Sequence, residues 1–109
     1  GGTFFMEATG TNADNVIAFA RCASKSAVNV GSVSANDRHD YLVVVNLSKN
    51  QTATVTLHPN TVDGINLPES GASKFTLSTR DLKTRAGHAA DLTALHLTAG
   101  EGVVVTGHC

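Results

Sequence analysis

Hydrophobic and polar residues alternate in the middle of the chain in a way that predicts two β-strands. Residues 41–47 form an apolar, β-branched run, and residues 52–57 alternate threonine with an aliphatic residue. Four polar residues separate the two runs, as in a short turn-forming loop. The pattern therefore predicts a β-hairpin over Tyr41–His58. In its second strand we expect the aliphatic residues to face a core and the threonines to face water.

Shorter apolar runs on both sides of this hairpin predict further strands. Phe75 and Leu77 alternate with polar residues, so we expect both to point inward. The segment 24–40 is more polar and predicts a short strand followed by a solvated loop. The other expected strands are an edge strand over Thr3–Ala8, a buried central strand over Asn15–Cys22, a strand over Ser73–Ser78, and a final pair over Leu92–Leu97 and Glu101–Thr106.

The chain shows no pattern of a long helix. Ser78-Thr79-Arg80-Asp81 has the form of a capping box, and Gly87 lies where a short helix would end, so this segment is either one or two helical turns or an irregular loop. Seven or eight short strands predict an all-β fold, an antiparallel β-sandwich with Greek-key connections. A chain of 109 residues has the size of one domain, and we expect residues 1–109 to form one.

The charge of the chain is nearly balanced. Eight Lys and Arg residues oppose nine Asp and Glu residues, with no basic stripe, so we expect no nucleic-acid partner and no membrane partner. No apolar run approaches the roughly 20 residues that span a bilayer, and no signal-peptide pattern is present. Because the chain begins with Gly1-Gly2 and not with Met, we expect a processed chain or part of a longer protein.

Two cysteines and two glycosylation motifs bear on the cellular location. Cys22 and Cys109 follow two apolar runs by similar short distances, so neighbouring strands could bring them together in a disulfide; the alternative is two free thiols. Asn46 and Asn50 each begin an N-x-S/T motif beside the predicted turn, where a glycan could be exposed. The sequence does not fix the location, although these features favour an extracellular one.

No group of residues predicts a catalytic or metal site. The histidines lack the H-x-x-x-H spacing of a zinc site, and no serine lies in a G-x-S-x-G motif. Most carboxylates lie in predicted turns, where aspartate bonds its own backbone. We therefore expect no catalytic residue, no metal ion and no cofactor. The residues considered are His39, His58, His88, His96, His108, Asp37, Asp40, Asp63, Glu69, Asp81, Asp91 and Glu101.

Aromatic residues are too few for an obvious sugar-binding platform. The chain has no Trp, one Tyr and four Phe, and the Phe residues are needed for the core. Tyr41 is the one candidate for stacking against a sugar ring, which makes an autonomous carbohydrate-binding module the less favoured interpretation.

Three stretches together resemble a known domain type: Asn-Val-Ile-Ala-Phe-Ala-Arg at 15–21, Tyr-Leu-Val-Val-Val-Asn-Leu-Ser at 41–48, and Glu-Gly-Val-Val-Val at 101–105. In this order the chain, from about Gly2 to Thr106, resembles the C-terminal β-sandwich that follows the catalytic (β/α)8 barrel in many glycoside hydrolases. It is most similar to that of the alpha-amylase family, and heparanase-like glycosidases carry a similar domain.

The resemblance implies a non-catalytic accessory domain. In these families the catalytic carboxylates lie on the barrel, so no catalytic residue carries over to this chain. The implied partner is the catalytic barrel of the same enzyme, which the domain packs on and stabilises; carbohydrate is a further possible partner. The alternative is a free-standing glycan- or protein-binding module. A large exposed apolar patch would favour the accessory domain, and a uniformly polar surface would favour the free-standing module.

Overall fold

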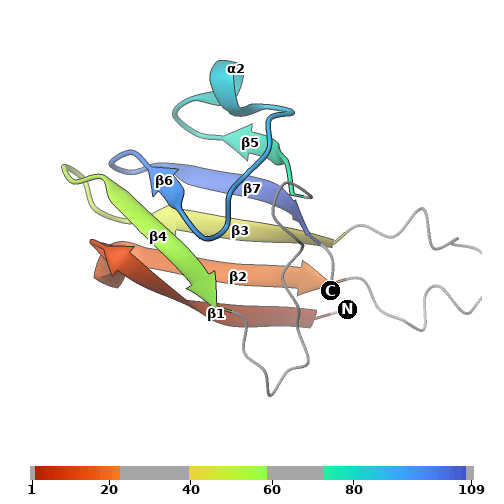
Figure 1. Ribbon diagram of the computed structural model, residues 1–109, viewed down its shortest axis with the longest axis horizontal. Coiled ribbons are helices and arrows are strands. Elements are labelled where there is room, and N and C mark those ends of the chain that lie inside the picture. Colours follow the sequence, from red (N-terminus) through yellow and green to blue (C-terminus); the bar gives the residue numbers. More distant parts are fainter. Residues whose placement is uncertain (1, 23–39, 59–72, 108–109) are drawn as a thin grey trace, which may run out of the picture.

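The computed structural model describes residues 2–22, 40–58 and 73–107 (Figure 1). The short strand expected between residues 24 and 40 lies outside these ranges. Within them the chain forms β-strands joined by turns, with one turn of 3-10 helix and one turn of α-helix. The elements are β1 (Gly2–Thr11), the 3-10 turn η1 (Ala13–Asn15), β2 (Val16–Cys22), β3 (Asp40–Asn46), β4 (Ala53–His58), β5 (Phe75–Ser78), α2 (Leu82–Arg85), β6 (Leu95–Leu97) and β7 (Gly102–Gly107).

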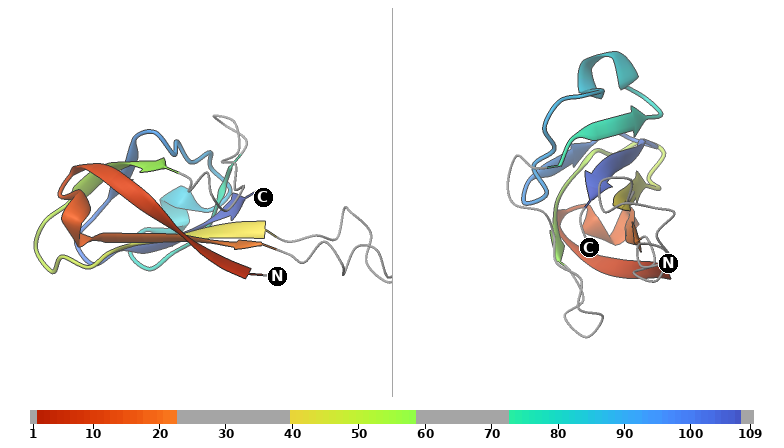
Figure 2. Two further views of the ribbon diagram at one scale, coloured as in Figure 1. Left: turned by 90° about the horizontal axis from the view of Figure 1, so that it is seen from below. Right: turned by 90° about the vertical axis from the view of Figure 1, so that its right-hand side faces the viewer.

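The described strands form one antiparallel sheet in the order β5-β7-β3-β2-β1-β4-β6. Residues 2–6 of β1 pair with β2, and residues 7–11 pair with β4. We call the part from β5 to the first half of β1 the wide half, and the second half of β1 with β4 and β6 the narrow half. The sheet curls so that the two halves face each other, and Figure 2 shows β1 crossing between them.

The all-β, antiparallel prediction is confirmed. Its finer details, two separate sheets and Greek-key connections, are not confirmed, because β1 belongs to both halves of one continuous sheet. The prediction of an edge strand at Thr3–Ala8 is incomplete, because residues 3–6 pair with β2 alone and residues 7 and 8 pair with β4 alone, so β1 passes from one half of the sheet to the other. β2 and β3 are central strands, as predicted.

The predicted hairpin over Tyr41–His58 is wrong. β3 pairs with β2 and β7, whereas β4 pairs with β1 and β6, so the polar segment between them connects the two halves of the sheet. A short polar loop predicts local pairing, but here both strands place their buried residues on opposite sides of the same core. The predicted faces of β4 are correct, since its aliphatic residues are buried and its threonines point outward.

The core lies between the two halves. Each strand contributes alternate small or aliphatic side chains, and every fully buried Val or Leu stabilises the fold by about 1.5 to 3 kcal/mol. The buried residues are Ala18, Ala20, Leu42, Val44, Phe75, Val103 and Val105 from the wide half, Ala53, Val55, Leu57, Leu95 and Leu97 from the narrow half, and Met6, Ala90 and Leu92.

The prediction that both Phe75 and Leu77 point inward is wrong for Leu77. β5 contains an irregularity in its register between these residues: Phe75 pairs with Val105, and Leu77 pairs with the very next residue, Val104. The extra residue of a bulge reverses the alternation of faces. Phe75 is therefore buried, whereas Leu77 is 45% exposed on the outer side of the sheet.

β1 approaches β4 most closely at Gly10, which pairs with Val55. Its φ is +126°, and a Cβ placed there would lie 2.4 Å from the carbonyl oxygen of Thr54. Any side chain at this position would push the two strands apart as well as straining the backbone. The contact between the shared strand and the narrow half thus requires glycine.

Replacing Gly10 with alanine should lower the free energy of unfolding by about 3 kcal/mol or more, because backbone strain and a backbone clash add together. Gly87→Ala is the matched control: its φ is +79°, but nothing lies within 4 Å of the added Cβ. We expect that variant to lose about 1 kcal/mol, from strain alone. Urea unfolding of both variants measures the difference, and equal losses would contradict the role of the close contact.

Candidate functional site

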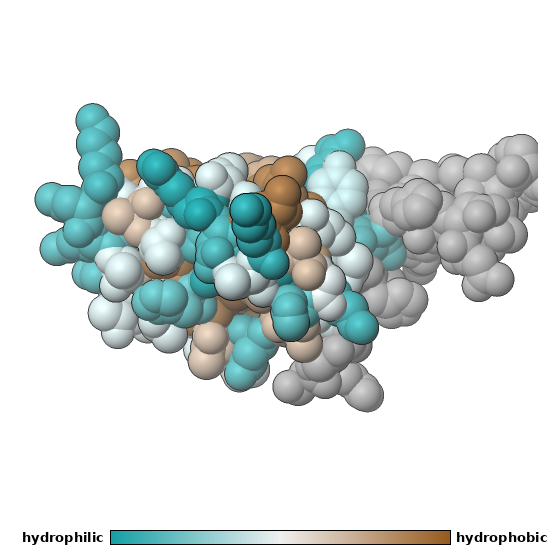
Figure 3. All heavy atoms as spheres, turned by 90° about the horizontal axis from the view of Figure 1, so that it is seen from above, coloured by the Kyte–Doolittle hydropathy of each residue, from teal (hydrophilic) through white to brown (hydrophobic). Residues whose placement is uncertain are grey.

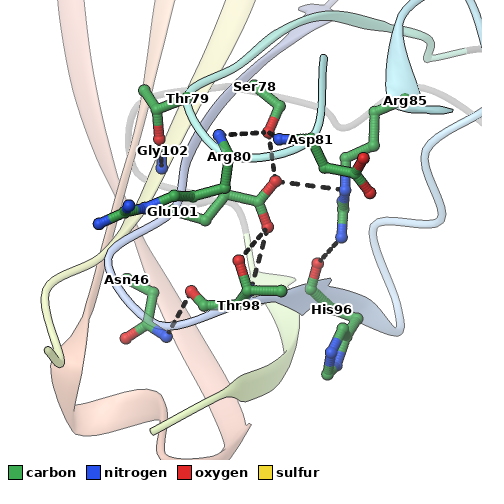
Figure 4. Close-up of polar contacts among 10 residues, drawn as sticks. All are labelled: Asn46, Ser78, Thr79, Arg80, Asp81, Arg85, His96, Thr98, Glu101 and Gly102. Carbon is green, nitrogen blue, oxygen red and sulfur yellow. Dashed lines mark hydrogen bonds and ion pairs between the residues drawn. The ribbon is translucent and has the colours of Figure 1, made fainter. Parts of the chain in front are cut away.

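A buried carboxylate is the most unusual polar feature of the described residues. Glu101 precedes β7 and is fully buried. Ser78 at the end of β5, Arg85 in α2 and Thr98 after β6 surround it (Figure 4). We call these four residues the Glu101 cluster. Chain segments from both halves of the sheet therefore meet at one charged group.

Both oxygens of the Glu101 carboxylate are occupied. Oε1 accepts hydrogen bonds from the backbone nitrogen of Thr98 at 3.0 Å and from its hydroxyl at 3.3 Å. Oε2 accepts the hydroxyl proton of Ser78 and lies 3.3 Å from Nε of Arg85. A buried charge is tolerated only when it is paired and hydrogen-bonded in this way. The carboxylate is thus engaged in holding the fold.

Arg85 also links the cluster to His96 in β6 and to Phe75 in β5. Its guanidinium donates to the carbonyl oxygen of His96 in β6 and lies 4.7 Å from the centre of the Phe75 ring in β5. Ser78 in turn accepts from the backbone nitrogens of Arg80 and Asp81, which shapes the turn before α2. The sequence placed Glu101 among turn carboxylates, and no local signal distinguishes it, because its burial depends on segments distant in the chain.

Asn46 lies next to this cluster and is also fully buried (Figure 4). Its Nδ2 donates to the carbonyl oxygens of Gln51 at 2.8 Å and Thr98 at 3.1 Å, and its Oδ1 accepts from the backbone nitrogen of Ser48. A nitrogen enclosed by two acceptors leaves no room for a glycan in this fold. Asn50 is exposed, and its glycosylation stays a prediction.

The three histidines that the structure describes are all exposed. His58 is exposed and its ring forms a hydrogen bond with the hydroxyl of Thr9 at 2.7 Å. His96 is also exposed and forms one with the hydroxyl of Thr54 at 3.0 Å. His88 is exposed, while His39 and His108 lie outside the described residues. Within ranges 2–22, 40–58 and 73–107, no three His, Cys, Asp or Glu side chains gather as a metal site would require.

Cys109 and the side chain of Cys22 are not described, so the disulfide stays a prediction. The other predicted turn carboxylates are in part accounted for by local bonds. Asp91 accepts from the hydroxyl and the backbone nitrogen of Thr93, at 2.6 and 2.9 Å. These bonds, the hydroxyl first, hold the pKa of Asp91 below its ordinary value of 3.8.

The outer face of the wide half carries a continuous set of apolar residues. In the strand register Phe5 lies opposite Phe19, Phe19 opposite Val43, Val43 opposite Val104, and Val104 opposite Leu77. This row crosses five strands, and Ile17 and Val45 form part of a second row beside it. We call the apolar face the set Phe5, Ile17, Phe19, Tyr41, Val43, Val45, Leu77 and Val104.

Several of these side chains are open to solvent. Phe5 is 65% exposed, Ile17 42% and Leu77 45%, whereas side chains in the centre of the face are half-buried by their neighbours. The rings of Phe5 and Phe19 lie 5.7 Å apart in a tilted arrangement. The sequence makes β2 and β3 apolar on both sides, and it predicts a buried central strand over Asn15–Cys22. The structure buries one side only.

A polar margin lies at one end of the apolar face. Arg21 pairs with Thr3 on one side and Tyr41 on the other, and Tyr41 pairs with Thr106. The guanidinium of Arg21 donates to the hydroxyl of Thr3. Lys74 joins this margin, because its backbone nitrogen donates to the hydroxyl of Thr106 and its carbonyl oxygen accepts from the backbone nitrogen of Thr106. Tyr41 is 39% exposed here, and its contact with a glycan stays a prediction.

The outer face of the narrow half is polar by comparison. Its outward residues are mainly threonine and histidine, in register across β1, β4 and β6. Figure 3 views the molecule from the side of α2 and β5 and shows hydrophobic residues interspersed with hydrophilic ones on that side. The outward residues of the narrow half are Glu7, Thr9, Thr11, Thr54, Thr56, His58 and His96.

The chain matches no protein-family model, and no curated protein is significantly similar to it. Within the described parts of the chain, no helix has the length and apolar character needed to cross a membrane. The geometry of the residues themselves therefore carries the functional argument.

Replacing Glu101 with alanine should lower the free energy of unfolding by about 3 to 5 kcal/mol, because it leaves Arg85 and the donors of Ser78 and Thr98 without their acceptor. The exposed Glu7→Ala is the control and should change stability by no more than about 0.5 kcal/mol. Thermal and urea unfolding measure both. A loss of less than about 1 kcal/mol for Glu101→Ala would show that the cluster does not hold the fold.

The carboxyl group of Asp91 should titrate below pH 3.8 in the folded protein. The pKa of Asp91 is lower in the folded chain than in the unfolded chain, where it is about 3.9. The bonds from Thr93 therefore stabilise the fold at pH values above the unfolded pKa, and this stabilisation is lost as the pH falls through the folded pKa. NMR titration of the carboxyl carbon measures the midpoint. Thr93→Ala removes the hydroxyl that donates to Asp91 and should raise the midpoint; an unchanged midpoint would contradict the assignment.

Proposed function

We propose that this chain is a non-catalytic accessory β-domain that packs through its apolar face on a companion domain of the same protein. The observation that carries the proposal is the row of aromatic and aliphatic side chains across five strands, with Phe5 and Leu77 exposed at its two ends. The largest exposed apolar patch on a monomer is often functional. The resemblance noted above makes the catalytic (β/α)8 barrel of a glycoside hydrolase the companion that we propose.

The dimensions of the face suit an interface between domains of one chain. Five strands about 4.8 Å apart give a width of about 20 Å, and residues two apart along a strand add about 7 Å per row, so the face covers about 300 Å². Removing that much apolar surface from water contributes about 7 kcal/mol before the losses of association. A modest interface is sufficient when a covalent linker keeps the effective concentration in the millimolar range.

The polar groups of the described residues agree with a non-catalytic role. The buried Glu101 has all of its acceptor capacity directed to Ser78, Arg85 and Thr98. A carboxyl group that acts as a general acid or base needs an oxygen that a substrate can reach, to donate a proton to it or to accept one from it. The proposal therefore assigns Glu101 to stability and the apolar face to function.

The test uses the full product of the reading frame that encodes this chain, which we expect to include a (β/α)8-barrel domain. In that protein Phe5→Ser should lower the melting temperature of the barrel by about 3 °C or more, because it removes an anchor of the interface. Thr11→Ser, on the outer face of the narrow half, is the control and should leave the melting temperature unchanged. Scanning calorimetry measures both variants.

Three results would overturn the proposal. One is a reading frame that encodes no barrel, and another is a barrel whose melting temperature Phe5→Ser leaves unchanged. The third is hydrolysis of glycosides by residues 1–109 alone, with the activity lost in Glu101→Gln. Each result separates an independent enzyme or binding module from an accessory domain.

A further inference from the structure

We infer that residues 80–88 form a strap over the edge of β5, that the side chain of Arg85 fastens it, and that it opens as a unit while the sheet stays folded. We call this segment the strap. It lies between β5 and β6 in the chain and contains α2. The inference concerns the border of the sheet and not the apolar face, so it does not depend on a companion domain.

The strap lies along the end strand of the sheet. β5 comes last in the strand order of the described sheet, next to β7, and Figure 1 shows α2 beyond it. The backbone of Phe75 bonds to the strap: its N–H donates to the carbonyl oxygen of His88 at 2.9 Å, and its carbonyl oxygen accepts from the nitrogen of Gly87 at 2.8 Å. An uncovered sheet edge is a template for strands of other chains. The strap therefore protects β5 at this position.

Arg85 is the one residue of the strap that is withdrawn from solvent. The other residues from 80 to 88 are all exposed, whereas the side chain of Arg85 is 15% exposed. Its Nε lies 3.3 Å from Oε2 of Glu101, its guanidinium donates to the carbonyl oxygen of His96, and its Cζ lies 4.7 Å from the centre of the Phe75 ring. A segment with few buried contacts opens at a low cost in free energy. The closed strap thus depends mainly on this side chain.

Fixed points at both ends limit the opening to the strap. Before it, the backbone nitrogen of Thr79 donates to the carbonyl oxygen of Gly102 in β7, and the nitrogen of Gly102 donates to the Thr79 hydroxyl, both at 2.9 Å. After it, Ala90 is buried, and its nitrogen donates to the carbonyl oxygen of Ser73 at 2.8 Å. Release of Arg85 would therefore free the strap and leave the pairing of β5 with β7 intact.

Opening would expose two groups that the closed fold hides. One is the backbone of Phe75, whose N–H and C=O groups would become available to another strand. The other is the carboxylate of Glu101, which is fully buried in the closed fold and would lose its ion pair with Arg85. The strap is thus a conformational device that conceals both a strand edge and a charge.

Native-state hydrogen exchange tests whether the strap opens separately. The backbone N–H groups of Phe75 and Gly87 report the strap, and those of Leu57 and Thr106, which bond to segments outside the strap, report the body of the fold. After correction for intrinsic rates, the two strap amides should exchange at least about a hundredfold faster than the two body amides. Their exchange should also depend less on urea, because opening the strap exposes little surface.

Three variants test what fastens the strap. Arg85→Gln should speed the exchange of the strap amides by about tenfold or more, because it removes a charged hydrogen-bond donor. Lys83→Gln removes an exposed charge from the same turn, α2, and should leave these rates within about twofold. Val44→Ala creates a cavity in the core and should speed the body amides by about tenfold or more. It should leave the strap amides within about twofold, because Val44 stays buried when the strap opens.

Equal exchange of strap and body amides in the wild-type chain would overturn the inference, because the segment would then open only with the whole fold. Strap amides that Arg85→Gln leaves unchanged, or that Lys83→Gln speeds equally, would also overturn it. If Arg85→Gln does not fold, Arg85→Lys should still speed strap exchange by about threefold or more, because a single ammonium lacks the fork that reaches both Glu101 and His96. None of these outcomes involves the apolar face, so the proposed function is tested separately.

Discussion

The fold depends on the backbone pairing of one strand with two halves of a sheet. The first part of β1 pairs with β2 and the second part with β4, so the sheet must curl and bring its inner faces together. Core side chains from both halves then exclude water, which supplies most of the stability. Gly10 permits the close approach of β1 to β4, because no Cβ can stand beside the carbonyl oxygen of Thr54. A substitution that separates β1 from β4 at Gly10 would therefore also disturb the packing between the two halves.

The Glu101 cluster secures the opposite side of the same arrangement. It joins the end of β5, the single turn of α2 and the segment after β6, none of which is long enough to be stable alone. The donors and acceptors of the cluster bond to one another, and hydrogen bonds require a defined geometry. The cluster therefore fixes the position of these segments relative to each other. Asn46 adds a second buried polar link between the wide half and the connection to β4.

Function follows from the asymmetry between the two outer faces. Threonine and histidine cover the narrow half and interact well with water, whereas the wide half presents aromatic and aliphatic residues. The core requires one apolar side of β2 and β3 and does not explain the other. A bulge in β5 even turns Leu77 outward to extend the face. The association that we propose would give these residues a physical role.

The sequence by itself determined the all-β class, the central strands and the faces of β4, because alternation and β-branched runs are local properties of a strand. It also indicated that β2 and β3 are apolar on both sides. Only the tertiary structure decided that Tyr41–His58 is not a hairpin, that β1 is shared between the two halves of the sheet, and that Glu101 is buried. These features depend on which distant strands pair, and the free energy of such pairing comes from contacts between segments that no local pattern records.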